Sequence, residues 1–309
     1  MCHLQKYVLK RFLSLFGTLF GVSVLVFLIV HMIPGDPARY IVGKNASEEA
    51  VKAMRAQLGL DQPLITQYFD YLGNLVRGDL GTSLFTGIPV WEEIVSRFPI
   101  TFQLAVYGVV LGSAIGILLG VIAAVKQNTL LDRLVNTLST ISISAPDFWV
   151  ILFVIWLFAY QFGWFPISGY DGFYSLVLPS LTIGLFSIGF IAKMTRSSML
   201  DVIKQDYMRT AEAKGVATWA RVFAHGLQNA VIPIITLIGL QFGGLLAGAV
   251  ITETVFALPG IGYFAIEAVI KRDIPTVQGV VLFVALLYTV VNLVTDIVYS
   301  FFDPRVRYE

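Results

Sequence analysis

Six stretches of this chain are each long and apolar enough to cross a lipid bilayer. A spanning helix needs about 20 consecutive, mostly apolar residues. The chain has only 13% charged residues, against about 25% in a soluble domain, so it cannot cover this apolar surface in water. The sequence therefore predicts an all-α membrane protein with six transmembrane helices. The predicted spans are Phe12–Ile33, Ile100–Val125, Leu134–Tyr160, Leu176–Ala192, Val231–Thr252 and Val277–Tyr299.

The first apolar stretch is expected to remain in the protein as a signal anchor. Lys6, Lys10 and Arg11 precede it, as basic residues precede the apolar part of a signal peptide. Its apolar run is longer than in a signal peptide, and no small-residue cleavage motif follows. Cys2 is the one cysteine, which excludes an internal disulfide. We expect Cys2 to be an incidental terminal residue rather than a lipidation site.

The distribution of lysine and arginine predicts the orientation in the membrane. The short outside loop 161–175 contains no basic residue, and the outside loop 253–276 contains only Lys271 and Arg272. Short cytoplasmic segments are enriched in basic residues, whereas long loops are largely exempt from this rule. We therefore expect both termini in the cytoplasm. The basic residues of the short inside segments are Lys6, Lys10, Arg11, Lys126, Arg133, Lys193, Arg196, Lys204, Arg209, Lys214, Arg221, Arg305 and Arg307.

The spans divide the chain into three parts. Residues 1–33 form a cytoplasmic N-terminus and the first span, and residues 34–99 form a small helical cap outside the membrane. Residues 100–309 form a core of five spans, which includes the cytoplasmic loop 193–229. The apolar content of the cap is too small for a separate core, so we do not expect an independent domain.

The cap carries local signals for short helices and turns. Ser47 can cap the N-terminus of a helix, with Glu48 and Glu49 favourable at its positive end, and Gly59 can end that helix. The remaining expected elements are a turn at Pro34–Pro37, a second helix from Asp61–Pro63 through Tyr71, a turn at Gly78–Gly81, and a short amphipathic segment at Trp91–Phe98.

Glycines recur on one face of the second span. Their four-residue spacing allows another backbone to approach closely, and the residues are Gly108, Gly112, Gly116 and Gly120. Further glycines lie in the first span, at Gly17 and Gly21, and in the fifth, at Gly239, Gly243, Gly244 and Gly248. Packing within one helix bundle and packing against a partner subunit would both explain the pattern.

Several polar side chains fall within the predicted spans, where they usually face a cavity or another helix. Tyr288, Asn292 and Asp296 are spaced by four and form one stripe on the sixth span, while Asp147 lies in the third span and Gln241 in the fifth. These five residues are candidates for the lining of a transport path. Hydrogen bonding between helices, or an interfacial position for Asp296, is the alternative.

No motif predicts that the chain itself performs chemistry. His3, His31 and His225 lack metal-ligand spacing with another histidine, cysteine or acid, so no metal site is expected. The sequence has neither a phosphate-binding G-x-x-x-x-G-K-[ST] motif nor a G-x-S-x-G motif. The net charge of +1 gives no argument for a nucleic-acid partner. The sequence indicates a chain that is not an enzyme.

The cytoplasmic loop 193–229 is long and mixed in charge. Asp206–Lys214 is predicted to form a short helix that ends at Gly215. Trp219, Val222 and Phe223 supply an apolar face after it. The pattern favours a docking surface for another protein, with a solvated loop as the alternative.

With these motifs together, the chain resembles the permease subunits of bacterial ATP-binding-cassette importers, in the dipeptide/oligopeptide/nickel branch and of its B type. The resemblance covers nearly the whole chain. It rests on ordered motifs at Leu58–Leu64, Gly78–Gly81, Tyr207–Gly215, His225–Pro233, Glu253–Gly260, Arg272–Pro275 with Val277–Gly279, and Asp303–Tyr308.

One motif departs from the broader importer pattern E-A-A-x-x-x-G. With its glycine placed on Gly215, Arg209 and Thr210 stand where the pattern has glutamate and alanine, and Ala211 matches the second alanine. Glu212 is then not the glutamate of the pattern. This departure is similar to the peptide branch.

The resemblance implies a type I importer permease (MetI-like) fold in a bacterial plasma membrane. It implies four kinds of partner: a second homologous permease subunit, two cytosolic ATPases that use ATP and Mg²⁺, an extracytoplasmic binding protein, and the lipid bilayer. This chain would bind no cofactor. Peptides are the expected cargo, with nickel chelates or glutathione as alternatives on the same scaffold. An ion-coupled secondary transporter and a membrane sensor are the alternatives of other classes, but the sequence lacks the paired intramembrane acids of the first.

The resemblance also implies which residues couple the chain to the ATPases. They are Arg209, Thr210, Ala211, Glu212, Ala213, Lys214 and Gly215.

Overall fold

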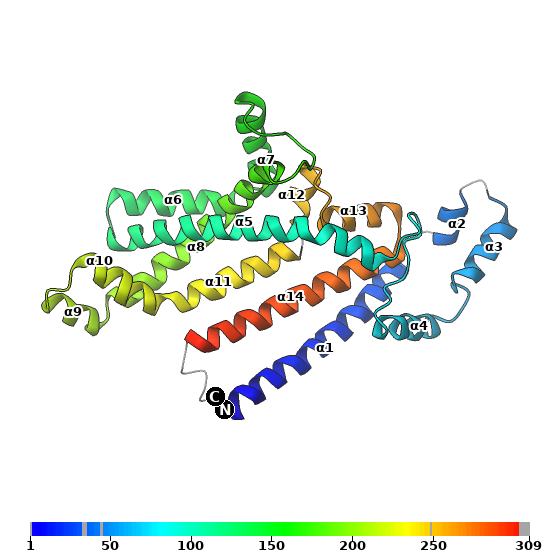
Figure 1. Ribbon diagram of the computed structural model, residues 1–309, viewed down its shortest axis with the longest axis horizontal. Coiled ribbons are helices and arrows are strands. Elements are labelled where there is room, and N and C mark those ends of the chain that lie inside the picture. Colours follow the sequence, from blue (N-terminus) through cyan, green and yellow to red (C-terminus); the bar gives the residue numbers. More distant parts are fainter. Residues whose placement is uncertain (1, 33–35, 44–45, 248, 303–309) are drawn as a thin grey trace.

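The computed structural model describes residues 2–32, 36–43, 46–247 and 249–302, all of them in helices, turns and loops apart from one isolated bridge between Thr82 and Pro89. Figure 1 shows a bundle of long helices that run side by side. Five helical stretches of the described residues are long and apolar enough to span a membrane, or six if one bent pair counts as a span. The five long helices are α1 (Cys2–Met32), α5 (Val90–Val125), α8 (Tyr174–Ile203), α11 (Gln228–Leu246) and α14 (Ile274–Phe302).

The predicted third span is broken rather than continuous. Helix α6 (Leu130–Ser144) ends before Pro146, and α7 (Asp147–Val154) with the π-helix η1 (Ile155–Gln161) continues at an angle of 106°. Ala145 has an extended backbone, as expected because a proline disfavours the helical conformation of the residue before it. Figure 1 shows that α7 turns away from the bundle. Asp147 therefore lies at the corner and not inside a straight span.

Two further boundaries differ from the sequence prediction. The segment Trp91–Phe98 is not a separate helix, because α5 runs through it and through Pro99; prolines are tolerated within membrane helices. The fifth span was expected to reach Thr252, but α11 ends at Leu246 and α12 (Val250–Val255) is separate.

The start of the fifth span also differs. The residues after the short cytoplasmic helix form α10 (Thr218–Ala220) and the π-helix η2 (Arg221–Leu227), which continue directly into α11. They are therefore the first turns of a membrane helix rather than part of the cytoplasmic loop 193–229, where the sequence placed them.

The cap contains three short helices, α2 (Pro37–Val42), α3 (Glu48–Gln57) and α4 (Leu64–Val76). The prediction for Ser47 is confirmed, because its side chain accepts a hydrogen bond from the backbone N–H of Ala50. Gly59 has φ +68° just after α3, the left-handed conformation that ends a helix. The second cap helix begins after Pro63, as predicted, but continues five residues beyond Tyr71. Residues 33–35 of the expected first turn lie outside the described residues.

The four glycines of α5 face α8 of the same chain. A Cβ on Gly116 would lie 2.9 Å from Ile191 Cβ, and one on Gly120 would lie 2.6 Å from the carbonyl oxygen of Ala192. Equivalent atoms on Gly108 and Gly112 would overlap Ile183 and Ser187. The glycine face thus lets the two helices meet almost backbone to backbone.

The other glycine groups behave differently. On α11, a Cβ on Gly239 would overlap Thr295 of α14, and one on Gly243 would touch Tyr288. Gly17 and Gly21 on α1 have open space around them. Gly248 lies outside the described residues.

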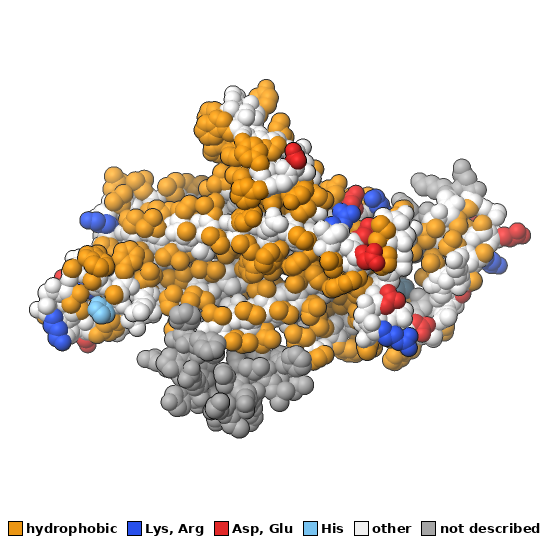
Figure 2. All heavy atoms as spheres, viewed as in Figure 1, with side chains coloured by type: hydrophobic (Ala, Val, Ile, Leu, Met, Phe, Trp, Pro, Cys, Tyr) orange, Lys and Arg blue, Asp and Glu red, His pale blue; other side chains and the backbone are white. Residues whose placement is uncertain are grey.

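The surface separates apolar from charged side chains. Figure 2 shows a broad hydrophobic surface over the middle of the bundle, with charged side chains gathered toward its two ends. One of these ends carries α9 (Asp206–Ala213), and the opposite end carries the cap and α13 (Ile261–Lys271) (Figure 1). This distribution fits a bilayer around the middle of the bundle.

Candidate functional site

The predicted coupling helix forms as α9 and is anchored to the start of the fifth span. Met208 is buried, with its methyl group close to Gly226 of η2. Arg221 forms an ion pair with Glu212, with 2.8 Å between Nη1 and Oε1. The helix is therefore held at one end of the bundle by an apolar contact and an ion pair.

Gly215 ends α9 in the left-handed conformation, with φ +76°. The backbone N–H of Gly215 donates to the Glu212 carbonyl at 2.9 Å, and that of Val216 donates to the Ala211 carbonyl at 3.1 Å. These bonds satisfy the last carbonyls of the helix. Ala211 is half-buried, and the other predicted coupling residues are exposed: Arg209, Thr210, Glu212, Ala213, Lys214 and Gly215.

An apolar groove lies at the same end of the bundle, between the end of α5 and the start of the fifth span. Its volume is about 470 Å³, and its lining includes Val121, Val125, Trp219 and Phe223. Trp219 is 72% exposed. Of the predicted apolar face, only Val222 is buried in the bundle.

Two of the five transport-path candidates share a cavity. Asp147 at the corner of the broken span and Gln241 on α11 line a space of about 550 Å³. The other walls come from the ends of α6 and α11 and from α8 and α12, and they are mostly apolar, with Phe186, Phe190 and Ile251 among them. The corner at Pro146, which hydropathy did not indicate, brings the carboxylate to this space.

The other three candidates lie on α14 and do not line this cavity. Tyr288 packs beside Gly243. Asn292 has a buried amide oxygen without a hydrogen-bond partner among the described residues. Tyr288, Asn292 and Asp296 all lie on α14 at helical spacing, as predicted. Of the five candidates, however, only Asp147 and Gln241 meet at this cavity.

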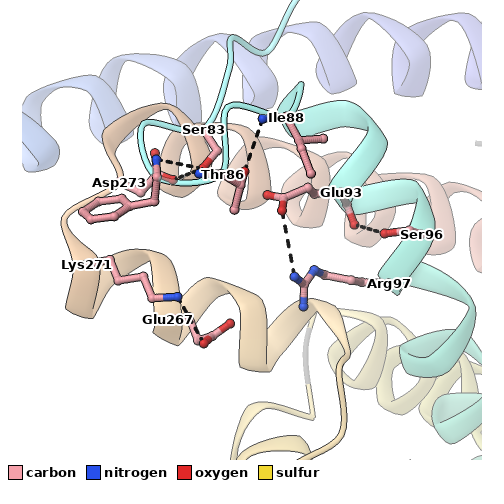
Figure 3. Close-up of polar contacts among 10 residues, drawn as sticks. Ser83, Thr86, Ile88, Glu93, Ser96, Arg97, Glu267, Lys271 and Asp273 are labelled. Carbon is pink, nitrogen blue, oxygen red and sulfur yellow. Dashed lines mark hydrogen bonds and ion pairs between the residues drawn. The ribbon is translucent and has the colours of Figure 1, made fainter. Parts of the chain in front are cut away.

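At the opposite end of the bundle, polar contacts join the segment before α5 to Asp273, which lies between α13 and α14 (Figure 3). Ser83 donates from Oγ to Asp273 at 2.5 Å, and the backbone N–H of Leu84 donates to the same carboxylate at 3.2 Å. Arg97 lies 4.0 Å from Glu93 and 4.3 Å from the ring centre of Phe264. These contacts hold the cap-to-span junction against α13.

A buried carboxylate, Glu253, organises the same end; in the sequence it stands out only as the first residue of the motif Glu253–Gly260. Glu253 is fully buried and accepts hydrogen bonds from Thr101 Oγ1 at 2.7 Å and from the backbone N–H of Tyr263 at 2.9 Å. Burial raises the pKa of Glu253, partly offset by these hydrogen bonds. The glycine at the end of this motif fits the buried carboxylate, because a Cβ on Gly260 would overlap the Glu253 carboxylate.

No group of three or more His, Cys, Asp or Glu residues in the described part of the chain could hold a metal ion.

Comparison with protein families identifies the scaffold. The family described as "Binding-protein-dependent transport system inner membrane component" matches residues 116–308, and its N-terminal family matches residues 4–105. The chain belongs to this permease family.

Individual relatives of the permease support the same family assignment. The chain is 46% identical to the glutathione transport system permease protein GsiC of Shigella flexneri serotype 5b and to that of Escherichia coli K12, over 98% of this chain and 99% of each relative. These relatives fit the dipeptide/oligopeptide/nickel branch and B-type subunit indicated by the sequence motifs.

Solved structures confirm the MetI-like fold of the permease. The MetNI methionine ABC transporter matches 68% of this chain and 96% of its own, with a TM-score of 0.60 at 19% identity. An amino acid ABC transporter solved with histidines matches 69% of this chain and 94% of its own, with a TM-score of 0.52 at 16% identity. With the family match, this fold makes the chain a multi-pass membrane subunit of an importer. The alternative of an ion-coupled secondary transporter is therefore rejected.

Proposed function

We propose that this permease forms half of the translocation path of an ATP-driven importer of short peptides, together with a second homologous permease subunit. Support for the cargo comes from the relatives at 46% identity, which are glutathione permeases. Glutathione is itself a tripeptide, so it falls within the proposed class. A nickel chelate is the second candidate.

The observation that carries the proposal is the position of α9. It is a short polar helix with most of its side chains exposed, held at one end of the bundle and far from the cap (Figure 1). We infer that two cytosolic ATPases bind ATP and Mg²⁺ and that one of them grips α9. In this proposal the chain binds no cofactor and catalyses no reaction, and it converts ATPase movement into movement of the helices.

The anchoring of α9 suits such a role. The ion pair between Arg221 and Glu212 and the buried Met208 connect α9 to the first turns of the fifth span. A push on α9 would therefore reach α11, which carries Gln241 at the cavity shared with Asp147. At the other end, the cap and α13 would receive the binding protein.

The proposal fixes an orientation, with both termini and α9 in the cytoplasm and the cap outside. The test uses single cysteines in a Cys2→Ser background. In intact cells, a membrane-impermeant maleimide should label Lys52→Cys in the cap and not Ala213→Cys in α9, and permeabilisation should expose the second. Labelling of Ala213→Cys but not of Lys52→Cys would reverse the orientation.

The decisive experiment measures ATP hydrolysis by the reconstituted complex, with and without loaded binding protein. Ala213→Arg places a large cation on the exposed face of α9 and should abolish the stimulation by loaded binding protein. The matched control is Gln127→Arg, an exposed position in the α5–α6 turn at the same end of the bundle. Normal stimulation and peptide uptake in the Ala213→Arg complex would contradict coupling through α9.

A further inference from the structure

The cavity shared by Asp147 and Gln241 contains a single charged side chain. Its lining contains one acid, Asp147, and no lysine or arginine. Asp147 forms no ion pair and Gln241 no side-chain hydrogen bond with another described residue. Most of the remaining wall is apolar.

The backbone around Pro146 fixes the position of Asp147 at the cavity. Pro146 stops α6, and the chain turns by 106° before α7 begins at Asp147. The carboxylate therefore lies on a corner fixed by the backbone, beside the ends of α11 and α12, rather than on a helix face that could rotate away. An ionised side chain in a membrane bundle is costly unless it faces water or a partner of opposite charge.

The side chains that line the cavity determine which chemical group can bind to Asp147. A metal ion would need several oxygen, nitrogen or sulfur ligands, and this cavity supplies one carboxylate. An anionic group would be repelled by Asp147 and would meet no basic side chain. A single ammonium group fits, because it can donate to a carboxylate and to the amide oxygen of Gln241 while apolar walls accept varied side chains.

We propose that Asp147 binds the free amino group of the cargo during its passage and that Gln241 helps to orient it. This inference rests on the proposed peptide cargo and adds a specificity: cargo with a free, protonated amino group crosses faster than cargo in which that group is blocked. The apolar walls formed by residues such as Phe186 and Phe190 then tolerate different side chains.

The test measures peptide uptake per ATP hydrolysed in the reconstituted complex with loaded binding protein. Asp147→Asn keeps the shape of the side chain and removes its charge, and should lower this ratio about tenfold or more, the loss of one charge-assisted hydrogen bond. Stimulation of ATP hydrolysis by loaded binding protein should stay within about twofold of the unmodified complex. Asp147→Glu should retain most uptake. Asp171→Asn, an exposed acid outside the cavity, is the matched control and should change nothing.

A second arm tests the amino group directly. A peptide and its N-acetylated form are chosen so that the binding protein binds both equally. The free peptide should cross the unmodified complex faster, and the two should cross the Asp147→Asn complex at the same rate. Equal rates in the unmodified complex, normal uptake per ATP in Asp147→Asn, or a joint fall of complex level and ATP hydrolysis would each overturn the inference. If the unmodified complex takes up no peptide at all, the proposed cargo fails instead.

Discussion

Arg196 on α8 grips Asp132 on α6 with two hydrogen bonds, from Nε at 2.5 Å and from Nη2 at 2.8 Å. Asp132 is buried and also accepts from the backbone N–H of Asn128 and from the side chain of Asn136. One carboxylate thus joins the α5–α6 turn to the helix that leads into α9. The pair is a rigid connection between the membrane bundle and the proposed coupling helix.

Removing one partner of this pair should strongly destabilise the permease. Asp132→Ala leaves the Arg196 guanidinium without its counter-charge, and losing one partner of a buried pair costs about 3–5 kcal/mol. We expect a clear fall in the thermal midpoint of the purified complex. The double variant Asp132→Ala/Arg196→Ala should lose less than the sum of the two single variants, and strict additivity would contradict the pairing. The control is Arg209→Ala. The Arg209 side chain is 77% exposed in its ion pair with Asp206, so its removal should leave the thermal midpoint unchanged.

The glycine face of α5 should tolerate no added side chain. Gly120→Ala places a methyl group against the backbone oxygen of Ala192, which cannot move aside as a flexible side chain could. Overpacking of this kind costs about 1–3 kcal/mol, so folded permease in the membrane should decrease. The control is Gly17→Ala on α1, where the added group meets open space. Equal amounts of the two variants, measured against total synthesis, would refute close packing of α5 on α8.

Thr101 should be needed for its hydroxyl group rather than for its shape. It donates to Glu253 and accepts from the backbone N–H of Ile261 at 2.9 Å. Thr101→Val keeps the volume but leaves the Ile261 N–H without its acceptor and Glu253 without one of its donors, at about 1–3 kcal/mol. Thr101→Ser restores the hydroxyl and should recover most of the thermal stability of the complex. Loss of the hydrogen bond should also raise the pKa of Glu253 further, because that bond lowers it. Similar stability of the Val and Ser variants would show that the hydroxyl is dispensable.

Gly215 should be replaceable only by a residue that accepts a left-handed backbone. At φ +76° a β-branched residue is strained by about 1–3 kcal/mol, whereas asparagine adopts this conformation more readily. We expect Gly215→Val to insert normally but to lose stimulation of ATP hydrolysis, and Gly215→Asn to keep most of it. No side chain would clash here, since a Cβ at this position meets open space. Equal loss in both variants would point to a direct contact at Gly215 instead of its backbone conformation.

The local signals in the sequence determined most of the helical framework. A long apolar run specifies a membrane helix wherever it lies, because water excludes it. Ser47, Gly59 and Gly215 marked helix ends through bonds to residues only three or four positions away. The four-residue glycine period on α5 likewise marked one closely packed face before its partner was known.

Tertiary structure decided which residues from distant segments contact one another. The bend at Pro146 changed a span into a corner and placed Asp147 beside Gln241, because hydropathy records the apolar content of a segment but not its direction. The partners Asp132 and Arg196 are 64 residues apart, and Thr101 and Glu253 are 152 apart. No periodicity within one helix predicts such pairs, since they depend on how whole helices pack. The sequence therefore determined which segments enter the membrane, and only packing between them decided which polar groups meet inside it.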